Sequence, residues 1–591
     1  MTPKVEKVDV AIIGAGWYGL VAARTYLRLR PAANLVIIDS DNTVGGVWSR
    51  DRIYPNLVAQ VRLGLFNYTD TPMPPYNGNP KDERVTGDMI HNYLQQYAED
   101  HDLLRRIRFN TFVSNASRCK DGSGSAWRLT LTSSNDSTEI LDTEKLLVCT
   151  GVTSIPSVPE YPGAQHASIP IIHSRDLGSS FEMLQDPSIE HVSVVGAAKS
   201  AYDAVYLLLS MGKKVTWIIR RDGAGPLAIL PFKILGLMNS IAVASTRLMT
   251  YLTPSILNTR GSLYWAFQRN PVGRWCVGRF WDSLTYLSNV HAGYSKGDHV
   301  QELRPEIDRQ SIFWANSGLG VVTLPDFWPT LHSPNLTVLR DNIDSIKGDS
   351  TLTLRSGQTL TTNCLVLCTG WGDHFGMFDD KTKAELGLPL SSTSPDTSDN
   401  GDDDDDDINW LKYDAEADTA VDHRLPFLAD QPKLKYTHRI GTHRYWRLYR
   451  RAIPVSLALR GDRSIAIMGQ IHTVQTPLVS EVQSFWAILY LLGELDLPGA
   501  EEMAREVSLW NAWTRKRYLT QGHKFPYSLY EFLPYVDTLF RDLGLNSRRK
   551  RNPVTELLEP YKPEDFNGFV DEYLARRSGK LNGVNGHKIA V

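Results

Sequence analysis

The sequence is poor in cysteine, in net charge and in long apolar runs. Its 591 residues contain five cysteines and carry a formal net charge of -3. The cysteines form neither a CxxC pair nor a cluster with metal-ligand spacing, so we expect no metal site and no disulfide framework, as is typical of a reducing compartment. The N-terminus passes from a charged lead straight into an apolar strand, which leaves no room for a signal peptide. These absences predict a cytoplasmic protein.

The near-neutral charge also limits the partners. A chain so close to neutrality exerts no long-range attraction on nucleic acid or on an anionic membrane. Arginines and aromatic residues are interleaved between His438 and Pro454, a pattern that also occurs in nucleic-acid binding. In an otherwise near-neutral chain, a surface helix with an apolar face, or a segment that anchors the phosphate of NADPH, is the better interpretation. We therefore expect small molecules, and no nucleic acid, as partners.

A dinucleotide-binding pattern opens the chain. The run from Val8 to Ile13 is β-branched and apolar, as a strand buried on both faces should be, and a helical pattern follows it. Between them lie Gly14, Gly16 and Gly19, which allow a tight turn, close approach of a pyrophosphate and close packing of helix on strand. Asp39 ends the next strand, 20 residues beyond Gly19, where a ribose hydroxyl needs an acceptor. Strand, helix and acid in register predict a dinucleotide site.

Further glycine turns favour FAD as this first cofactor. The segment GGVWS, from Gly45 to Ser49, adds a turn whose backbone can lie against a ligand, and we expect Gly46 and Trp48 to contact the flavin nucleotide. Two apolar strands, LLVCTG and CLVLCTG, end in small residues where the chain must pass close to a cofactor or change domain. Gly151 and Gly370 are therefore candidate cofactor-binding residues. The cysteines of these strands are interpreted as buried small residues.

A second unit of the same kind has alanines in place of two of the glycines. Gly196 keeps the essential turn, and alanine is small enough for the other positions, so the unit is retained, with Ser200 at the start of its helix. The charge at the end of the next strand is inverted, because Arg220 and Arg221 stand where the first unit has Asp39. Guanidinium groups can bind a 2′-phosphate that a carboxylate would repel. The second unit is predicted to bind NADPH; the alternative is that two surface arginines follow an ordinary strand.

The order of these motifs resembles that of the flavin-containing monooxygenases, the class that includes Baeyer-Villiger and N-hydroxylating enzymes. The resemblance covers roughly residues 8–372, and a weaker echo continues between residues 463 and 487. It implies FAD and NADPH as cofactors, and O2 and a hydrophobic small molecule as substrates. It also implies that NADPH passes hydride to FAD and that reduced flavin traps O2 as a C4a-(hydro)peroxide, which inserts one oxygen atom into the substrate. The motifs that carry the resemblance are the FAD fingerprint at 14–19, GGVW at 45–48, LLVCTG at 146–151, the NADPH fingerprint at Gly196 and CLVLCTGW at 364–371.

Two departures from the family pattern concern the candidate catalytic residues. His173 matches the histidine of a family linker motif, but Ala167 and Ile169 stand at the expected Phe and Gly positions. The resemblance implies that His173 takes part in coupling the domains, and a hydrogen-bonded structural histidine is an equal alternative. Gln60 matches an asparagine that lies near the flavin in several N- and S-oxidising relatives. Its amide is expected to hydrogen-bond a flavin peroxide or bound NADP, and the alternative is a loop glutamine that touches neither.

An apolar and aromatic segment at residues 226–300 is the candidate substrate lid. Pro231, Lys233, Gly236 and Asn239 interrupt any continuous span of ~20 apolar residues, which argues against a transmembrane helix. We favour a lid over a large hydrophobic natural product, such as a polyketide, terpenoid or alkaloid intermediate. Contact with a membrane surface and plain domain core are the less favoured alternatives.

The chain is therefore predicted to be an α/β flavoprotein with two Rossmann-like dinucleotide-binding domains, the FAD domain interrupted by the NADPH domain, and a mostly helical C-terminal cap. The rival functions are an NADPH-dependent oxidase or reductase that inserts no oxygen, and a redox-sensing protein that binds FAD and NADPH without turnover. Neither rival needs a substrate lid. The predicted domains are a first FAD part at 1–177, an NADPH domain at 178–335 with the lid at 226–300, a second FAD part at 336–497 with a disordered acidic loop at 391–407, and the cap at 498–591.

Overall fold

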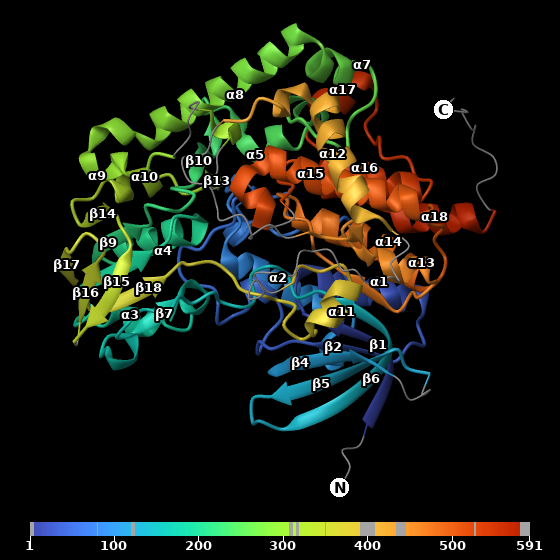
Figure 1. Ribbon diagram of the computed structural model, residues 1–591, viewed down its shortest axis with the longest axis horizontal. Coiled ribbons are helices and arrows are strands. Elements are labelled where there is room, and N and C mark those ends of the chain that lie inside the picture. Colours follow the sequence, from blue (N-terminus) through green and yellow to red (C-terminus); the bar gives the residue numbers. More distant parts are fainter. Residues whose placement is uncertain are drawn as a thin grey trace.

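The computed structural model describes residues 5–79, 81–119, 124–305, 311–314, 318–348, 350–390, 408–432, 445–524 and 527–579. Two mainly parallel sheets form separate layers, and helices from the C-terminal part cover one face of the first sheet (Figure 1). The first sheet lies at the bottom of the view, the second at the left, and the C-terminal helices, coloured orange and red, at the right. The acidic segment 391–407, expected to be a disordered loop, lies outside the described residues.

The first sheet is built around a strand that is apolar on both faces. Its strands are β1 Val5–Ile13, β2 Leu35–Ile38, β3 Ile107–Arg108, β4 Thr111–Arg118, β5 Trp127–Ser133, β6 Thr138–Val148 and β21 Ile465–Ile467. In β1, Val10 and Ile12 belong to one buried core while Ala11 and Ile13 belong to another, because successive side chains point to opposite faces. β2 and β6 flank β1 in parallel. This arrangement confirms the predicted first α/β unit.

A strand from the C-terminal part of the chain completes the first sheet by pairing with the C-terminal end of β6. β4 and β5 form an antiparallel meander on β6, and β21 pairs in parallel with Leu146–Val148 of the same strand. Ile13, Val148 and Ile467 therefore lie side by side at the carboxyl edge of the sheet. The turns that follow these three strands meet there, which is the edge where α/β proteins bind their ligands.

The second sheet is parallel throughout, in the order β14-β9-β8-β18-β7. Its strands are β7 Ile171–His173, β8 His191–Val195, β9 Lys214–Ile219, β14 Leu336–Arg340 and β18 Cys364–Leu367. The boundaries expected at residues 177 and 335 cut through this sheet. Strand β7 precedes the first boundary, and β14 and β18 follow the second, because a parallel sheet gathers strands that long connections separate in sequence. The second unit therefore extends from about residue 171 to about residue 367.

The remaining elements are short strands, in small sheets of two or three, and helices. The other strands are β10 Ala228–Pro231, β11 Lys233–Ile234, β12 Met238–Asn239, β13 Leu319–Val322, β15 Ile343–Lys347, β16 Thr351–Leu354, β17 Thr359–Thr361, β19 Leu448–Tyr449 and β20 Ile453–Pro454. The helices up to residue 331 are α1 Trp17–Leu29, α2 Gly87–Asp100, α3 Phe181–Gln185, α4 Lys199–Ser210, α5 Ser240–Ala244, α6 Arg247–Leu252, α7 Ser262–Tyr264, α8 Pro271–Ala292, α9 Asp298–Gln301 and α10 Phe327–Leu331. The later helices are α11 Asp380–Glu385, α12 Trp410–Arg424, α13 Val455–Leu459, α14 Thr476–Leu491, α15 Ala500–Lys524, α16 Phe532–Asp542, α17 Pro553–Leu558 and α18 Phe569–Arg577.

The C-terminal helices share one core with the first sheet. Helix α14 packs against α1, and its side chains are buried almost throughout. Residues of α15 and α16 belong to the same apolar cluster as Val10 and Ile12 of β1. The predicted helical C-terminal region is confirmed, and it is continuous with the first unit. No helix in the described part of the chain is both long enough and apolar enough to span a bilayer.

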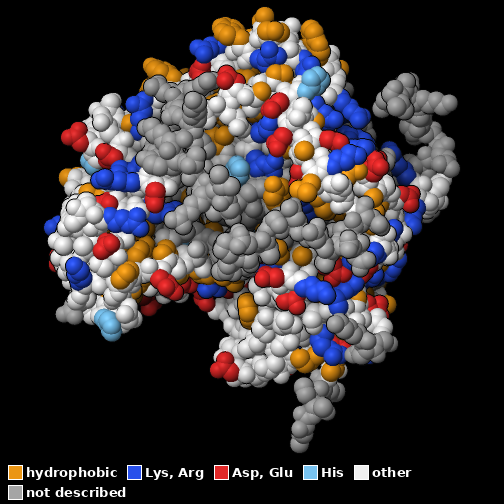
Figure 2. Space-filling model, in the orientation of Figure 1, with side chains coloured by type: hydrophobic (Ala, Val, Ile, Leu, Met, Phe, Trp, Pro, Cys, Tyr) orange, Lys and Arg blue, Asp and Glu red, His pale blue; other side chains and the backbone are white. Residues whose placement is uncertain are grey.

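The segment expected to be a lid has a buried side and an exposed side. Its longest helix, α8, runs along the top of the molecule, where Figure 2 shows apolar side chains at the surface. Trp281 is buried and donates a hydrogen bond to the carbonyl of Leu252 at 2.9 Å. Trp265, Val272 and Trp275 are exposed on the outside. The inner side of the segment is therefore core, and its role as a lid stays a prediction.

A buried ion cluster joins this segment to the C-terminal helices. Arg247 begins α6, is 7% exposed, and donates hydrogen bonds to Glu556, to Asp537 at 2.6 Å and to the carbonyl of Ser547 at 2.8 Å. Glu556 is 8% exposed. A buried charge is tolerated only with such partners, because its transfer from water costs several kcal/mol. These contacts fix residues 247–252 against α16 and α17.

We predict that Arg247→Met lowers the free energy of unfolding by about 3–5 kcal/mol, because Glu556 loses a charged partner in a buried place. Equilibrium denaturation in urea measures the change. Arg28→Met is the matched control, since Arg28 pairs with Asp571 at the surface and should cost less than about 1 kcal/mol. Equal small losses in both variants would contradict the assigned role of the cluster.

Candidate cofactor-binding and active site

Backbone contacts at the carboxyl edge of the first sheet form a cradle that side chains would fill. Gly14 has a φ of +109°, and a Cβ on it would lie 2.4 Å from the carbonyl oxygen of Cys149. A Cβ on Gly19 would lie 1.8 Å from the carbonyl oxygen of Gly14. Glycine is therefore required at both positions, one for the turn and one for the packing of α1 on β1.

A second glycine turn faces the first. Gly45 donates a backbone hydrogen bond to the carbonyl of Ala15 at 3.0 Å. A Cβ on Gly16 would lie 3.7 Å from the Cα of Gly46, so the two turns lie in contact. The carbonyl of Trp48 lies 3.1 Å from Nδ1 of His91, which holds the end of the turn on α2. The predicted residues Gly16, Gly46 and Trp48 are thus brought together.

The N-terminus of α1 opens into this cradle without a side-chain cap. Its N-cap residue is Gly16, and no acidic side chain lies in the first turn. Helix α4 begins in the same way at Ala198. Each helix therefore keeps backbone N–H donors and the positive end of its dipole for a ligand. An anion such as a pyrophosphate satisfies both requirements.

Asp39 follows β2 and is bound to the first glycine loop. It is 8% exposed and accepts hydrogen bonds from the backbone N–H groups of Ala15 at 2.5 Å and Asp41 at 2.8 Å. Burial raises the pKa of its carboxyl group to about 6, and the two N–H donors oppose that rise. The carboxylate is therefore tied to the glycine loop and ready to accept from a hydroxyl.

Buried polar atoms without protein partners lie around the same edge of the sheet. Within the described part of the chain, Oγ1 of Thr150, Oε1 of Gln470 and Oε1 of Gln475 receive no hydrogen bond. Thr150 follows β6, and the two glutamines follow β21. Such atoms are costly unless a ligand or water satisfies them. The donor and acceptor set, together with the glycine cradle, fits FAD.

The turn after β21 was missed as a candidate site by the sequence analysis. Gly469 has a φ of +77°, and a Cβ on it would lie 3.1 Å from the ring of Tyr18 in the first turn of α1. The signal that identifies the turn is the same as in the first unit: an apolar strand, Ile465–Ile467, followed by a glycine and then a helix. The absence of a second and third glycine concealed it.

The second unit repeats the geometry of the first. Gly196 has a φ of +139°, and a Cβ on it would lie 2.3 Å from the carbonyl oxygen of Cys368. Gly14 has the same relation to Cys149, and both cysteines are buried, as predicted. Ser200 lies in the first turn of α4. The replacement of glycine by alanine has therefore preserved the fold of the unit.

The two arginines at the end of β9 differ in their surroundings. Both are exposed. Nε of Arg221 donates to the carbonyl of Arg340, and its backbone N–H donates to Oδ1 of Asn342 at 3.2 Å. The Arg221 side chain is therefore tied to the end of β14. Arg220 is the better placed of the two to bind a phosphate.

His173 connects the end of β7 to the turn after β18. Its Nε2 lies 3.1 Å from the carbonyl oxygen of Gly370, and its Nδ1 accepts from the backbone N–H of Arg175 at 3.1 Å. Burial lowers the pKa of the imidazole, so the ring is neutral with its proton on Nε2. Both nitrogens are engaged by the protein. This arrangement favours a positioning role for His173, through Gly370, over contact with the reacting atoms.

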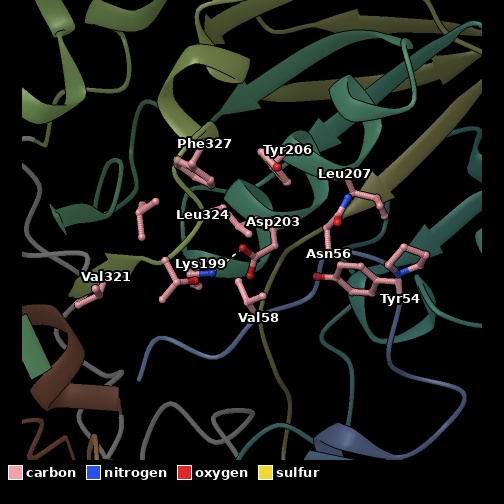
Figure 3. A pocket seen from close by; sticks show the side chains of 13 residues that line it. Tyr54, Asn56, Val58, Lys199, Asp203, Tyr206, Leu207, Val321, Leu324 and Phe327 are labelled. Carbon is pink, nitrogen blue, oxygen red and sulfur yellow. Dashed lines mark hydrogen bonds and ion pairs between the residues drawn. The ribbon is translucent and has the colours of Figure 1, made fainter. Parts of the chain in front are cut away.

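Gln60 connects the first unit to β13. Its Oε1 accepts from the backbone N–H of Val321 at 2.8 Å. The loop before it lines a pocket at the start of α4, shown in Figure 3, where Lys199 and Asp203 form an ion pair at 2.5 Å. The pocket also contains Tyr54, whose pKa burial raises well above its ordinary value. Gln60 therefore lies between the two nucleotide-binding units.

Comparison with known proteins agrees with this geometry. Residues 7–228 match the family described as "Flavin-binding monooxygenase-like". The chain is 40% identical to the FAD-dependent monooxygenase DEP4 of Alternaria brassicicola over 98% of this chain and 97% of that protein. It is 38% identical to the FAD-dependent monooxygenase resA of Aspergillus sclerotiorum over 98% of this chain and all of that one. The chain belongs to the family of FAD-dependent monooxygenases.

Solved structures confirm the fold alone. Cyclohexanone monooxygenase from Rhodococcus sp. Phi1, in a structure bound to NADP+, has a TM-score of 0.57 at 14% identity, covering 92% of this chain and 98% of that one. The closed structure of a cyclohexanone monooxygenase has a TM-score of 0.58 at 13% identity, covering 91% of this chain and 97% of that one. The two-sheet α/β architecture with a helical C-terminal part is therefore a known flavin-monooxygenase fold.

We predict that Gly19→Ala abolishes FAD binding, because the added methyl group would force α1 away from the turn at Gly14. The FAD content of the purified protein measures the loss. Gly499→Ala is the matched control, since a Cβ there meets no atom within 4 Å. A yellow Gly19→Ala protein with a full complement of FAD would contradict the cradle.

Affinity for FAD should rise with pH through about 6. The raised pKa of Asp39 means that the free protein holds a proton there below about pH 6. Ribose hydroxyls donate hydrogen bonds to the ionised carboxylate of Asp39, so FAD binding must release the proton that Asp39 holds. The dissociation constant for FAD should therefore increase about tenfold for each pH unit below the pKa of Asp39. Titration of apoprotein with FAD from about pH 5 to about pH 8, followed by flavin fluorescence, measures the slope. Asp39→Asn should remove it; the same slope in that variant would contradict the assignment.

Proposed function

We propose that this monooxygenase uses NADPH to reduce FAD and then inserts one oxygen atom from O2 into a hydrophobic small molecule, in the cytoplasm. FAD, when bound, supplies the redox and oxygen chemistry. The residues of the chain bind the two nucleotides, align them and exclude water. No Ser-His-Asp or metal constellation is needed for this division of labour.

One continuous segment carries the proposal, because it touches both nucleotide-binding units. It begins at the Gly45–Gly46 turn, which lies against the first glycine loop. Tyr54 and Val58 line the pocket at the start of α4. Gln60 then binds the backbone of β13. Nucleotides held at the N-termini of α1 and α4 would meet along this segment, and hydride transfer requires such an alignment.

Strand order supports the direction in which each nucleotide would lie. In the first sheet, Asp39 ends β2, α1 follows β1, and the turns after β6 and β21 lie beyond, so a dinucleotide with its ribose at Asp39 places its flavin toward β21. In the second sheet, Arg220 ends β9, α4 follows β8, and Gly370 follows β18. The flavin of FAD and the nicotinamide of NADPH, which we call the redox ends, would then lie at the side of each site opposite to the adenosine.

Two features support NADPH and a hydrophobic substrate. Arg220 lies one residue beyond the register position of Asp39 in the second unit and is exposed, so a 2′-phosphate can reach it. The inner side of residues 226–300 and the C-terminal helices supply an apolar surround next to β13. We propose a natural-product intermediate of polyketide, terpenoid or alkaloid type as substrate, with residues 226–300 as its lid.

The decisive experiment is NADPH oxidation under ¹⁸O₂ with a panel of hydrophobic ketones, amines and aromatic polyketides. We expect one ¹⁸O atom in the product from at least one panel member, detected by mass spectrometry. Complete recovery of the consumed oxygen as hydrogen peroxide across the panel would support an oxidase instead. A protein that never oxidises NADPH would be a binding or sensing protein.

Arg220→Ala should lower the ratio of kcat/KM for NADPH to kcat/KM for NADH by about tenfold to a hundredfold, since a charge-assisted hydrogen bond to phosphate contributes about 1.5–3 kcal/mol. Steady-state NAD(P)H oxidation measures both values. Arg260→Ala, another exposed arginine, is the control and should leave the ratio unchanged. An unaltered preference for NADPH in Arg220→Ala would contradict the assignment of the phosphate site.

A further inference from the structure

Strand β13 has one edge that side chains occupy in place of a neighbouring strand. Its other edge pairs with β10 in parallel. On the free edge, Oε1 of Gln60 accepts from the N–H of Val321 at 2.8 Å, and the hydroxyl oxygen of Tyr527 accepts from the N–H of Leu319. Residues two apart on a strand present their amides to the same side. Gln60 and Tyr527 therefore lie next to each other, about 7 Å apart along the strand.

Glycines on β13 and just before it allow this close approach. A Cβ on Gly318 would lie 2.9 Å from the hydroxyl oxygen of Tyr527, and a Cβ on Gly320 would lie 3.1 Å from Oε1 of Gln60. A side chain at either position would crowd these two polar groups. The positions of Gln60 and Tyr527 are thus fixed by the backbone of β13.

Anchoring by their oxygens leaves the proton donors of both side chains available. Only the oxygen of the Gln60 amide can accept a hydrogen bond from the N–H of Val321. The NH2 group of the same amide must therefore point elsewhere. The hydroxyl of Tyr527 accepts from Leu319 and keeps its own proton, because burial raises the pKa of the phenol to about 12. Within the described residues, neither donor has an acceptor.

His472 adds a third polar group beside these two. Its ring stacks on that of Tyr527, with centroids 4.8 Å apart and planes at 10°. The two backbones form a bridge, and the N–H of Ser528 donates to the carbonyl of His472 at 3.0 Å. The His472 side chain is exposed, and the protein around its ring lowers the pKa of the imidazole to about 4, so the ring is neutral. The neutral imidazole offers one donor and one acceptor.

We propose that Gln60, His472 and Tyr527 form a polar wall that binds an acceptor oxygen of the substrate, a carbonyl oxygen in particular. The inference rests on the proposed function, since it assumes that the substrate lies where the two nucleotides meet. His472 follows β21 at the carboxyl edge of the first sheet, and Gln60 ends the segment that reaches α4. The wall therefore lies at the redox ends of both sites. It selects oxygen-bearing molecules over plain hydrocarbons of the same shape.

Equilibrium binding to the FAD-loaded protein tests the wall. The probes are 2-decalone and decalin, which share a bicyclic skeleton and differ by the carbonyl group, and the change in visible flavin absorbance reports binding. We expect the ketone to bind at least about fivefold more tightly than the hydrocarbon, as one net hydrogen bond of about 1 kcal/mol requires. Equal affinities, or no detectable binding of either probe, would overturn the inference.

Three variants localise the effect. Gln60→Glu keeps an oxygen that can accept from Val321 and removes the NH2 donor. His472→Phe keeps a ring that can stack on Tyr527 and removes the ring nitrogens. Tyr527→Phe removes the hydroxyl. Each should reduce the preference for the ketone. Tyr76→Phe is the matched control, because Tyr76 lies under the guanidinium group of Arg84, 5.5 Å from its ring centroid, outside the wall, the nucleotide sites and residues 226–300. A preference unchanged in all three variants would overturn the inference.

Oxygen uptake with NADPH, measured on the same preparations, separates this inference from the proposed function. A wild-type protein that consumes NADPH and O2 but does not distinguish the two probes would refute the wall alone. A wild-type protein that prefers the ketone but never oxidises NADPH would refute the proposed function while the binding site stands.

Discussion

Backbone contact at the start of two helices is the constraint on which the rest of this structure depends. In both units a glycine follows a buried strand and lies against the carbonyl of a cysteine on the neighbouring strand: Gly14 against Cys149, and Gly196 against Cys368. No side chain fits there, and none caps the helix that follows. Each helix therefore begins with unsatisfied N–H donors, which costs free energy in the free protein and is offset by an anionic ligand.

The two nucleotide-binding units are joined in a way that suits their proposed chemistry. The first sheet and the C-terminal helices share one core, so the turn after β21 and the residues around Tyr527 form one body with the FAD site. The strands of the second sheet meet the first unit through polar interactions, such as the pair of Arg175 and Asp41 at 3.0 Å, whereas the long connection between these strands contributes apolar residues to the core of the first unit. Polar contacts of this kind can be exchanged for hydrogen bonds to water at low cost in free energy. A shared apolar core cannot be separated without exposing apolar surface.

The sequence predicted the local features of the fold better than the long-range ones. The glycine turns, Asp39 and the buried cysteines follow from short strand-turn-helix patterns, and the structure places them as expected. The boundaries of the second unit did not follow, because β7, β14 and β18 join its sheet across connections that no local pattern records.

The candidate site shows the same limit. Gln60 could be named from the resemblance, but its bond to Val321 spans 261 positions in the chain. His472 and Tyr527 carry no motif, and only the fold brings them together. His173 could be singled out from the linker motif, whereas the engagement of both its nitrogens could be seen only with Gly370 and Arg175 in place.

We propose that nucleotides bound at the two helices meet, so that hydride passes directly from one to the other. The most direct test is anaerobic stopped-flow reduction of the bound flavin by NADPH and by NADPH deuterated at the transferred position. We predict that the flavin bleaches and that deuterium slows the bleaching. A flavin that dithionite reduces but NADPH does not would contradict the proposal.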